Sequence, residues 1–252
     1  MKQRIISGAV IAVVTIAAVL LSGYFFDAVM ILLAFQACRE VIMVRKNEKF
    51  SYPLFGLMFI SLMIMIFLSD YRNYVIILLP VILGGIAVFD EKLSFEHVGL
   101  IYFLTGLIGY GLSFMRMLEY YDMFLLGALF VVCYLTDTFA YFTGMKFGKH
   151  KLNERISPKK TIEGSVVGWI IGSVCTFIWC FVFNLLNPGM IVCCIVLPVV
   201  SQIGDLIFSM IKRHFDIKDF SNFIPGHGGI LDRYDSILTT AVVFGVIFML
   251  FV

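Results

Sequence analysis

Long apolar runs, separated by short polar breaks, follow one another along almost the whole chain. An α-helix needs about 20 apolar residues to cross the hydrocarbon core of a bilayer. A helix also makes all of its backbone hydrogen bonds internally, as lipid requires. The pattern therefore predicts about nine spans, at roughly 4–22, 25–45, 53–69, 73–90, 97–115, 121–144, 163–185, 189–212 and 234–252.

The composition agrees with this interpretation. Of the 252 residues, 61% are hydrophobic and 14% are charged, which is too apolar for a soluble domain. We expect an all-α, polytopic transmembrane helical bundle. Residues 1–120 form N-terminal helices for packing, dimer contact or a lipid cradle, and residues 121–252 form helices with polar loops that carry the chemistry.

The distribution of positive charge predicts the orientation, because Lys and Arg concentrate on the cytoplasmic side of membrane proteins. With a cytoplasmic N-terminus, all of the 19 Lys and Arg residues except Arg72 and Arg116 fall on the inner side. The two most polar loops, 145–162 and 213–233, then face the cytoplasm, where soluble nucleotides and Mg²⁺ are found.

Two aspartates lie within predicted spans. An ionised Asp inside a span costs about 2.5–3.5 kcal/mol on insertion scales, so Asp137 and Asp205 need compensation. Asp205 comes about two helical turns before Lys212 and Arg213, which places it inside the membrane rather than in the loop.

Two further aspartates begin the last span. Asp232 and Asp235 are one helical turn apart, so they share a face and could face Asp205 across the bundle. A divalent cation prefers carboxylate oxygens and offsets the cost of these acids. The alternative explanation is that basic side chains neutralise them: Lys212, Arg213 and Arg233.

Two loops have the residues of a phosphate site. Ser157-Pro-Lys-Lys-Thr161 combines a proline that sets a turn with two lysines, hydroxyl groups and the N–H groups of a helix start. Pro225-Gly-His-Gly-Gly229 lets the backbone approach a ligand closely, because glycine has no Cβ. His227 is a candidate phosphate donor or acid/base. The ordinary alternatives are a positively charged cytoplasmic loop and a structural histidine.

Glycines at 164, 168 and 172 open the span at 163–185. Small residues at this spacing let two helix backbones approach closely. The sequence leaves open whether this face packs inside the chain or against a second copy. Walker-type and Rossmann-type nucleotide motifs are absent, which argues against a soluble-type NTPase or kinase.

The most specific stretch reads Ser209-x-Ile-Lys-Arg213-x4-Lys218-Asp219-x-Ser221-x2-Ile-Pro225-x-His227-Gly-Gly-Ile230-x-Asp232-Arg-Tyr-Asp235. It resembles the signature of the phosphatidate cytidylyltransferases (CDP-diacylglycerol synthases). Tyr234 departs from this signature, which usually has an aliphatic residue, Phe or Thr. The resemblance extends to Asp137-x-x-Ala-Tyr141, Ser157-Pro-Lys-Lys-Thr161-x-Glu163-Gly164 and Gly204-Asp205-Leu206-x-x-Ser209, whereas the first 120 or so residues match only as generic spans.

The resemblance implies that CMP is transferred from CTP to phosphatidate with Mg²⁺, giving CDP-diacylglycerol and pyrophosphate. It also implies a homodimer in the inner membrane, metal binding by Asp205 and Asp232, and K⁺ near that metal. No nucleic-acid partner is expected. We expect catalytic roles for Asp205, Asp232, Asp235, Lys212 and Arg213. Contacts with CTP are expected from Asp137, Ser157, Lys159, Lys160, Thr161 and Glu163, and contacts with phosphate or the lipid headgroup from Arg233, His227, Lys218 and Asp219.

The division between cations that face CTP and cations that face the lipid stays open. Related lipid enzymes, such as a CTP-using polyprenol kinase or an archaeal-type CDP-lipid synthase, are alternatives, and their products distinguish them, because a kinase releases CDP. A transporter is a different class. It predicts polar residues near the bilayer midplane in two related halves, whereas the polar residues here gather at one face.

Overall fold

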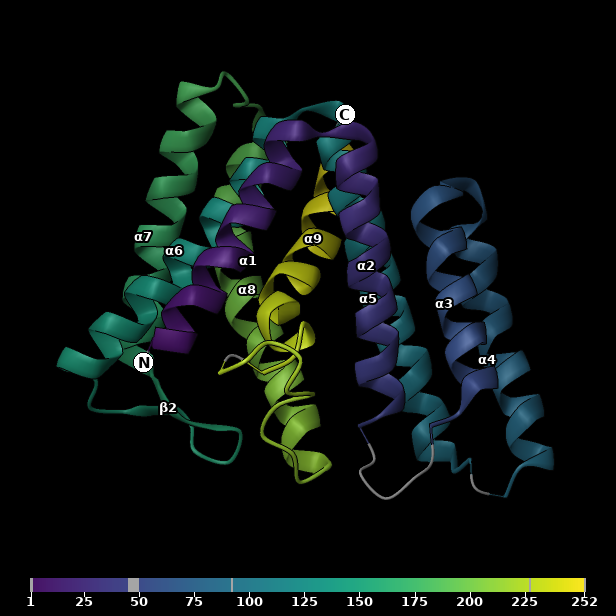
Figure 1. Ribbon diagram of the computed structural model, residues 1–252. Coiled ribbons are helices and arrows are strands. Elements are labelled where there is room, and N and C mark those ends of the chain that lie inside the picture. The colour runs from purple at the N-terminus through teal and green to yellow at the C-terminus, as the bar shows by residue number, and fades with distance from the viewer. Residues whose placement is uncertain (1, 45–49, 92, 227, 252) are drawn as a thin grey trace.

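The computed structural model describes residues 2–44, 50–91, 93–226 and 228–251. Within these residues the chain forms the predicted bundle of α-helices (Figure 1). The elements are α1 (Lys2–Leu21), α2 (Gly23–Ile42), α3 (Tyr52–Phe67), the 3₁₀ turn η1 (Ser69–Tyr71), α4 (Arg72–Phe89), α5 (Phe95–Tyr121), α6 (Met123–Phe147), β1 (Lys151–Asn153), β2 (Ser157–Thr161), α7 (Ile162–Val182), α8 (Pro188–His214) and α9 (Leu231–Phe251).

Six helical segments of the described residues are long and apolar enough to cross a membrane. These are the segment Ser69–Phe89 and the helices α5 to α9. Helix α3 is shorter, at 16 residues, and α2 contains Asp27, Arg39 and Glu40. A multi-pass membrane bundle is therefore confirmed, while the count of nine spans and the cytoplasmic N-terminus stay predictions.

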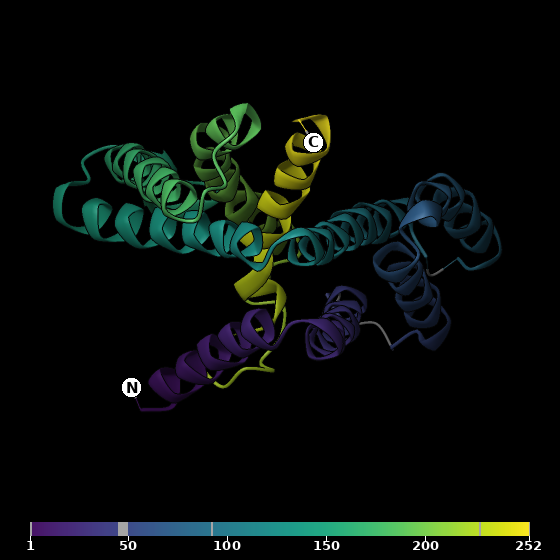
Figure 2. The same ribbon diagram turned by 90° about the horizontal axis from the view of Figure 1, so that it is seen from above.

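Helix α9 lies at the centre of the bundle, as the view from above shows (Figure 2). It packs against α5 on one side and against α6 and α8 on the other. Helices α3 and α4 pack on α5, and α7 packs on α6. One hydrophobic core runs through residues from both predicted regions, 1–120 and 121–252, and the division into these two regions stays a prediction.

Side-chain caps set the starts of several helices. The carboxylate of Asp122 accepts from the N–H of Phe124 at 2.7 Å, and Asn187 accepts from the N–H of Met190 at 2.9 Å. Thr161 accepts from the N–H of Gly164 at 3.2 Å. The first N–H groups of a helix have no partner within it, so such caps stabilise its start.

The glycines of α7 face α6. A Cβ added to Gly168 would lie 2.7 Å from the carbonyl oxygen of Thr136, and one added to Gly172 would lie 2.1 Å from the hydroxyl oxygen of the same residue. Gly164 makes a similar approach to the carbonyl of Ala140. The structure thus selects internal packing, one of the two explanations that the sequence left open.

We expect Gly168→Ala to destabilise the bundle by about 1–3 kcal/mol, the usual cost of overpacking. Gly85→Ala in α4 is the matched control, because an added Cβ there meets nothing within 4 Å. Thermal unfolding in detergent measures both variants. Equal midpoints for Gly168→Ala and Gly85→Ala would contradict the close packing of α6 and α7.

A small β-hairpin in the otherwise helical bundle corrects one sequence-based expectation. Strands β1 and β2 pair antiparallel, with Lys151 opposite Thr161 and Asn153 opposite Ser157. Pro158 lies within β2 rather than in a turn. The turn is fixed instead by Asn153, whose side-chain oxygen accepts from the N–H of Ile156 at 3.1 Å. Asn favours such turns, and proline is tolerated in an edge strand.

Candidate functional site

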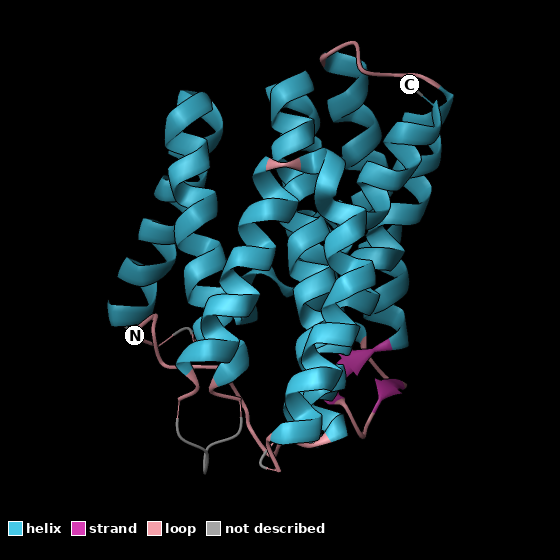
Figure 3. Cartoon of the chain, turned by 90° about the vertical axis from the view of Figure 1, so that its right-hand side faces the viewer, coloured by secondary structure: helices cyan, strands magenta, loops and turns pink. Residues whose placement is uncertain are grey.

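The β-hairpin lies at one end of the helical bundle (Figure 3). Residues of the hairpin contribute to the lining of a polar cavity of about 1090 Å³. Its wall is formed by parts of α6, β2, α8 and α9, together with the loop between α8 and α9 (residues 215–230, called here the α8–α9 loop). Many large hydrophobic side chains are exposed on the described part of the chain, so a cavity with this charged lining is the candidate site. The predicted residues that line it are Asp137, Lys159, Lys160, Thr161, Asp205, Lys212, Asp219, Asp232, Arg233 and Asp235.

The hairpin brings Lys160 to Asp205. The Nζ atom of Lys160 lies 2.5 Å from Oδ2 of Asp205, and the hydroxyl of Ser209 donates to Oδ1 of the same carboxylate at 3.2 Å. About 29% of the Asp205 side chain is exposed, so this acid is open to a ligand. Its position within α8, two turns before Lys212, is the predicted one.

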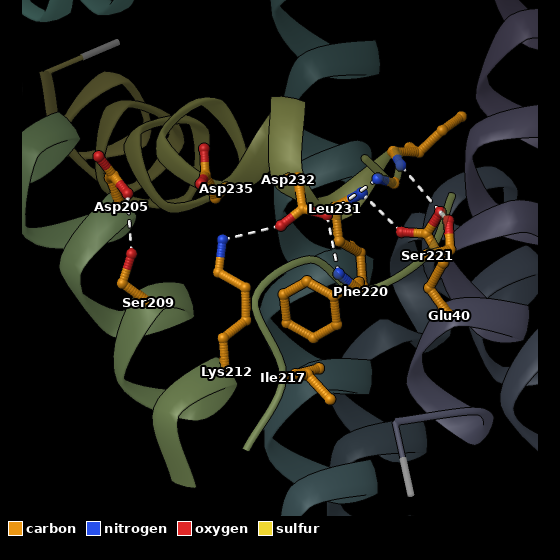
Figure 4. A network of polar contacts seen from close by, with 12 residues as sticks. Glu40, Asp205, Ser209, Lys212, Ile217, Phe220, Ser221, Leu231, Asp232 and Asp235 are labelled. Atoms are coloured by element: carbon orange, nitrogen blue, oxygen red, sulfur yellow. Dashed lines mark hydrogen bonds and ion pairs between the residues drawn. The ribbon is translucent and has the colours of Figure 1, made fainter. Parts of the chain in front are cut away.

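Lys212 and Asp232 form a buried ion pair (Figure 4). Lys212 Nζ donates to Asp232 Oδ1 at 2.7 Å, and the two side chains are only 10% and 2% exposed. The other carboxylate oxygen accepts from the backbone N–H of Phe220 at 2.8 Å and of Gly229 at 2.9 Å. The carboxylate of Asp232 is therefore neutralised by Lys212. This is the alternative to metal binding that the sequence left open.

Asp137 and Asp235 line the cavity from α6 and α9. The hydroxyl of Ser236 donates to Asp137 Oδ2 at 3.5 Å, while its backbone N–H donates to Asp235 Oδ1 at 2.8 Å. The predicted shared face of Asp232 and Asp235 is present, since both line the cavity at the start of α9. Tyr234 also lines the cavity, and its hydroxyl pairs with that of Thr15 in α1 at 3.3 Å.

Four predicted residues are absent from the described lining of the cavity: Ser157, Glu163, Arg213 and Lys218. The carboxylate of Glu163 accepts from the backbone N–H groups of Lys149 and His150 at 3.1 and 3.2 Å, so it holds the start of the hairpin. The guanidinium of Arg213 donates to the carbonyls of Ile156 and Ile217 at 3.5 and 3.4 Å. His227 lies outside the described residues.

The sequence interpretation missed several residues of the site. Gln202 and Ser236 line the cavity, and their spacing gave a signal, because Gln202 precedes Asp205 by one helical turn and Ser236 follows Asp235 directly. Glu40 was missed for a different reason. It lies in the N-terminal helices, for which the sequence indicated only generic spans.

Glu40 binds the α8–α9 loop and the first residue of α9 from the side of α2 (Figure 4). Its Oε1 accepts from the hydroxyl of Ser221 and the N–H of Ile230, both at 2.8 Å. Its Oε2 accepts from the N–H of Leu231, also at 2.8 Å. The buried charge is thus fully engaged with the loop that carries the signature residues.

The cavity concentrates opposite charges beside an apolar membrane region. Among the described residues, no group of three or more His, Cys, Asp or Glu side chains is arranged to hold a metal ion. Mg²⁺ is usually held by one or two carboxylates together with substrate phosphates rather than by an all-protein cage. The accessible carboxylate of Asp205, with Asp235 lining the same cavity, fits a metal that arrives with a polyphosphate.

Comparison with known proteins identifies the family to which the chain belongs. The chain matches the family described as the cytidylyltransferase family over residues 2–251. It is 32% identical over 254 residues to a phosphatidate cytidylyltransferase of Bacillus subtilis, a match that covers 94% of each chain. It is 40% identical over 167 residues to the enzyme of that name from Haemophilus influenzae, covering 64% of this chain and 58% of that one. This membrane protein belongs to the cytidylyltransferase family.

Proposed function

We propose that this protein transfers CMP from CTP to phosphatidate, giving CDP-diacylglycerol and pyrophosphate. The observation that carries the proposal is the polar cavity, which joins acids and lysines from all the predicted polar segments at one end of an apolar bundle. The names of the relatives indicate the substrates. Exposed apolar side chains on a helix that lines the cavity, such as Phe142 and Met145 of α6, suit a substrate whose acyl chains stay in the bilayer.

The proposed transfer depends more on neutralising negative charge than on a general base. The attacking group is a phosphate monoester, which is already anionic at neutral pH, and the main obstacle is its repulsion from the triphosphate. Cationic groups that neutralise this charge and align the two reactants lower the barrier. We assign the triphosphate to Lys159 and Lys160 in β2, with Thr161 beside them, and the presence of all three in the cavity lining supports this assignment.

We assign the lipid phosphate to Arg233, which lines the cavity at the start of α9. Lys212 supplies positive charge to the cavity wall while it neutralises Asp232. Arg213 has a supporting part in this arrangement, because its guanidinium holds Ile156 of the hairpin turn and Ile217 of the α8–α9 loop. We therefore propose a division in which β2 faces CTP and α9 faces the lipid.

We propose Mg²⁺ as the cofactor, held by Asp205 and Asp232 with Asp235 beside them. When bound, the ion supplies charge neutralisation and a fixed position for the triphosphate. Asp205 offers the more accessible carboxylate, whereas Asp232 is almost fully buried against Lys212. A contact from Asp232 would therefore require Lys212 to move. A nearby K⁺ and a homodimer are further proposals that rest on the family resemblance.

We place the cavity on the cytoplasmic side of the bacterial inner membrane. The start of α1, the β-hairpin and the α8–α9 loop lie at one end of the bundle, and the end of α9 lies at the other (Figure 1). The charge bias that predicts a cytoplasmic N-terminus then puts the cavity where CTP is available. The relatives named above are bacterial.

Product analysis tests the proposed reaction. Purified protein in detergent is incubated with phosphatidate, Mg²⁺ and CTP labelled in the cytosine ring or at the γ-phosphate. We expect the cytosine label in the lipid phase and the γ label in pyrophosphate. Release of CDP with the γ label in the lipid would instead identify a kinase and would refute the proposal.

A further inference from the structure

Glu40 is the buried charged group that the proposed mechanism leaves without a role. Only 1% of its surface is exposed, and it lies near the end of α2, in the region for which the sequence alone indicated only generic spans. A buried carboxylate is costly unless it is fully hydrogen-bonded. The contacts that offset this cost therefore indicate what Glu40 holds in place.

The donors to Glu40 come mainly from the segment that leads into α9. The N–H groups of Ile230 and Leu231 and the hydroxyl of Ser221 each donate at 2.8 Å. The side-chain amide of Gln36, one turn earlier in α2, donates at 3.0 Å. Backbone N–H groups at a helix start have no partner within the helix and attract negative charge. Glu40 thus stabilises the start of α9 from a different helix.

Asp232 holds the same segment from the opposite side. The N–H of Gly229 donates to Asp232 Oδ2 at 2.9 Å, whereas the next two N–H groups donate to Glu40. Residues 229–231 therefore lie between two carboxylates, and Figure 4 shows these opposing contacts. The entry of the chain into α9 is fixed by both acids together.

Gly229 makes the approach of Glu40 possible. A Cβ added to Gly229 would lie 2.5 Å from Glu40 Oε2 and 2.6 Å from the carboxyl carbon. A residue with a side chain would push α2 away from the loop. Gly229 of the signature therefore leaves room for the carboxylate of Glu40. In the sequence, Glu40 precedes its partner Ile230 by 190 residues.

We propose that Glu40 is a positioning residue for the nucleotidyl transfer. It fixes the α8–α9 loop and the first turn of α9, which presents Asp232, Arg233 and Asp235 to the cavity. The kinetic test of this inference rests on the proposed function, because it measures CMP transfer. It gives α2 a defined part in the site, although Glu40 itself is absent from the lining of the cavity.

Glu40→Gln tests the proposal with little change of shape. The amide keeps one acceptor oxygen but presents N–H groups to donors of the loop, so the loop loses its fixed position. Because small misplacements of reacting groups cost up to about 100-fold, we expect kcat to fall about tenfold or more, with KM for CTP changed less than about threefold. A purely structural role would lower the yield of folded protein and leave kcat per folded molecule unchanged.

Glu119→Gln is the matched control. Glu119 also connects separate helices, because its carboxylate accepts from the hydroxyl of Ser22 and from the N–H of Gly23. Gly23 begins α2 and Glu40 lies near its end, so this connection is about 25 Å from Glu40 along the helix. We expect Glu119→Gln to keep the wild-type kcat. An equal kcat in Glu40→Gln and wild type, or equal losses in both variants, would overturn the proposal.

Hydrogen exchange gives a readout that does not depend on activity. In Glu40→Gln we expect faster amide exchange at residues 219–224 and 228–232 than in wild type, and no such change in Glu119→Gln. Unchanged exchange there would overturn the positioning role. If wild-type protein transfers no CMP, the proposed function fails, and the exchange experiment still decides the role of Glu40.

Ser221→Ala is the second test of the positioning role, for the case in which Glu40→Gln does not fold. This variant removes one donor to Glu40 and keeps the charge. We expect a smaller loss of kcat with the same pattern of faster exchange in the α8–α9 loop. Wild-type kcat together with wild-type exchange in Ser221→Ala would overturn the proposal.

Discussion

Replacing Asp205 with asparagine is expected to lower kcat for CMP transfer by about 100-fold or more, the scale at which electrostatic groups of an active site act. Asparagine keeps the size of the side chain and removes its charge. Asp205 is the half-buried acid of α8, and it binds both Lys160 and Ser209. The substitution removes the carboxylate charge to which we assign Mg²⁺ binding. It also releases Lys160, to which we assign CTP binding.

The dependence on Mg²⁺ separates these two causes. If Asp205 contributes to metal binding, the residual activity of Asp205→Asn needs a higher Mg²⁺ concentration for half-maximal rate. If it only holds Lys160, KM for CTP rises and the Mg²⁺ requirement stays the same. Steady-state assays with labelled CTP in detergent measure both quantities.

Asp27→Asn is the control for this prediction. Asp27 pairs with Arg116 at 2.6 Å, and the two side chains are 25% and 36% exposed. The same chemical change is thus made in another ion pair, near the start of α2 and away from the cavity. A kcat for Asp205→Asn within about threefold of the control would contradict the assignment.

The second large effect concerns stability. We expect Lys212→Met to destabilise the protein by about 3–5 kcal/mol, the usual result of removing one partner from a buried ion pair. Asp232 has a side chain that is 2% exposed. It would keep its two backbone donors, from Phe220 and Gly229, but its charge would lose the lysine that pairs with it.

Arg213→Met is the matched control, because Arg213 is the exposed neighbour of Lys212 and, among the described residues, donates to backbone carbonyls rather than to a carboxylate. The double variant Lys212→Met/Asp232→Asn should recover most of the loss. An asparagine oxygen can still accept from Phe220 and Gly229, and no charge remains to be neutralised. Thermal unfolding in detergent distinguishes the variants. A midpoint for Lys212→Met equal to that of Arg213→Met would show that the pair contributes little to stability.

The sequence predicted the parts of this molecule that depend on local pattern. The apolar runs located the helices, because length and hydrophobicity are properties of each segment alone. The positions of Asp205, Asp232 and Asp235 within their helices followed from the helical repeat. The signature residues led to the correct family because several polar segments had to match together.

The parts that the sequence did not predict depend on contacts between distant residues. The β-hairpin was interpreted as a loop with a turn at Pro158, because the pairing of Lys151 with Thr161 leaves no periodic pattern in so short a segment. Glu40 was overlooked because its partners lie in the α8–α9 loop. A single charged residue near the end of an apolar helix more often meets water or headgroups than a buried loop.

Removal of divalent metal ions tests the central claim, that acids and lysines of one cavity act on a polyphosphate held with Mg²⁺. Purified protein is treated with excess EDTA, assayed for transfer of labelled CMP to phosphatidate, and assayed again after Mg²⁺ is restored. We predict that CDP-diacylglycerol formation stops in EDTA and returns with Mg²⁺. Full turnover in the presence of excess EDTA would contradict the account.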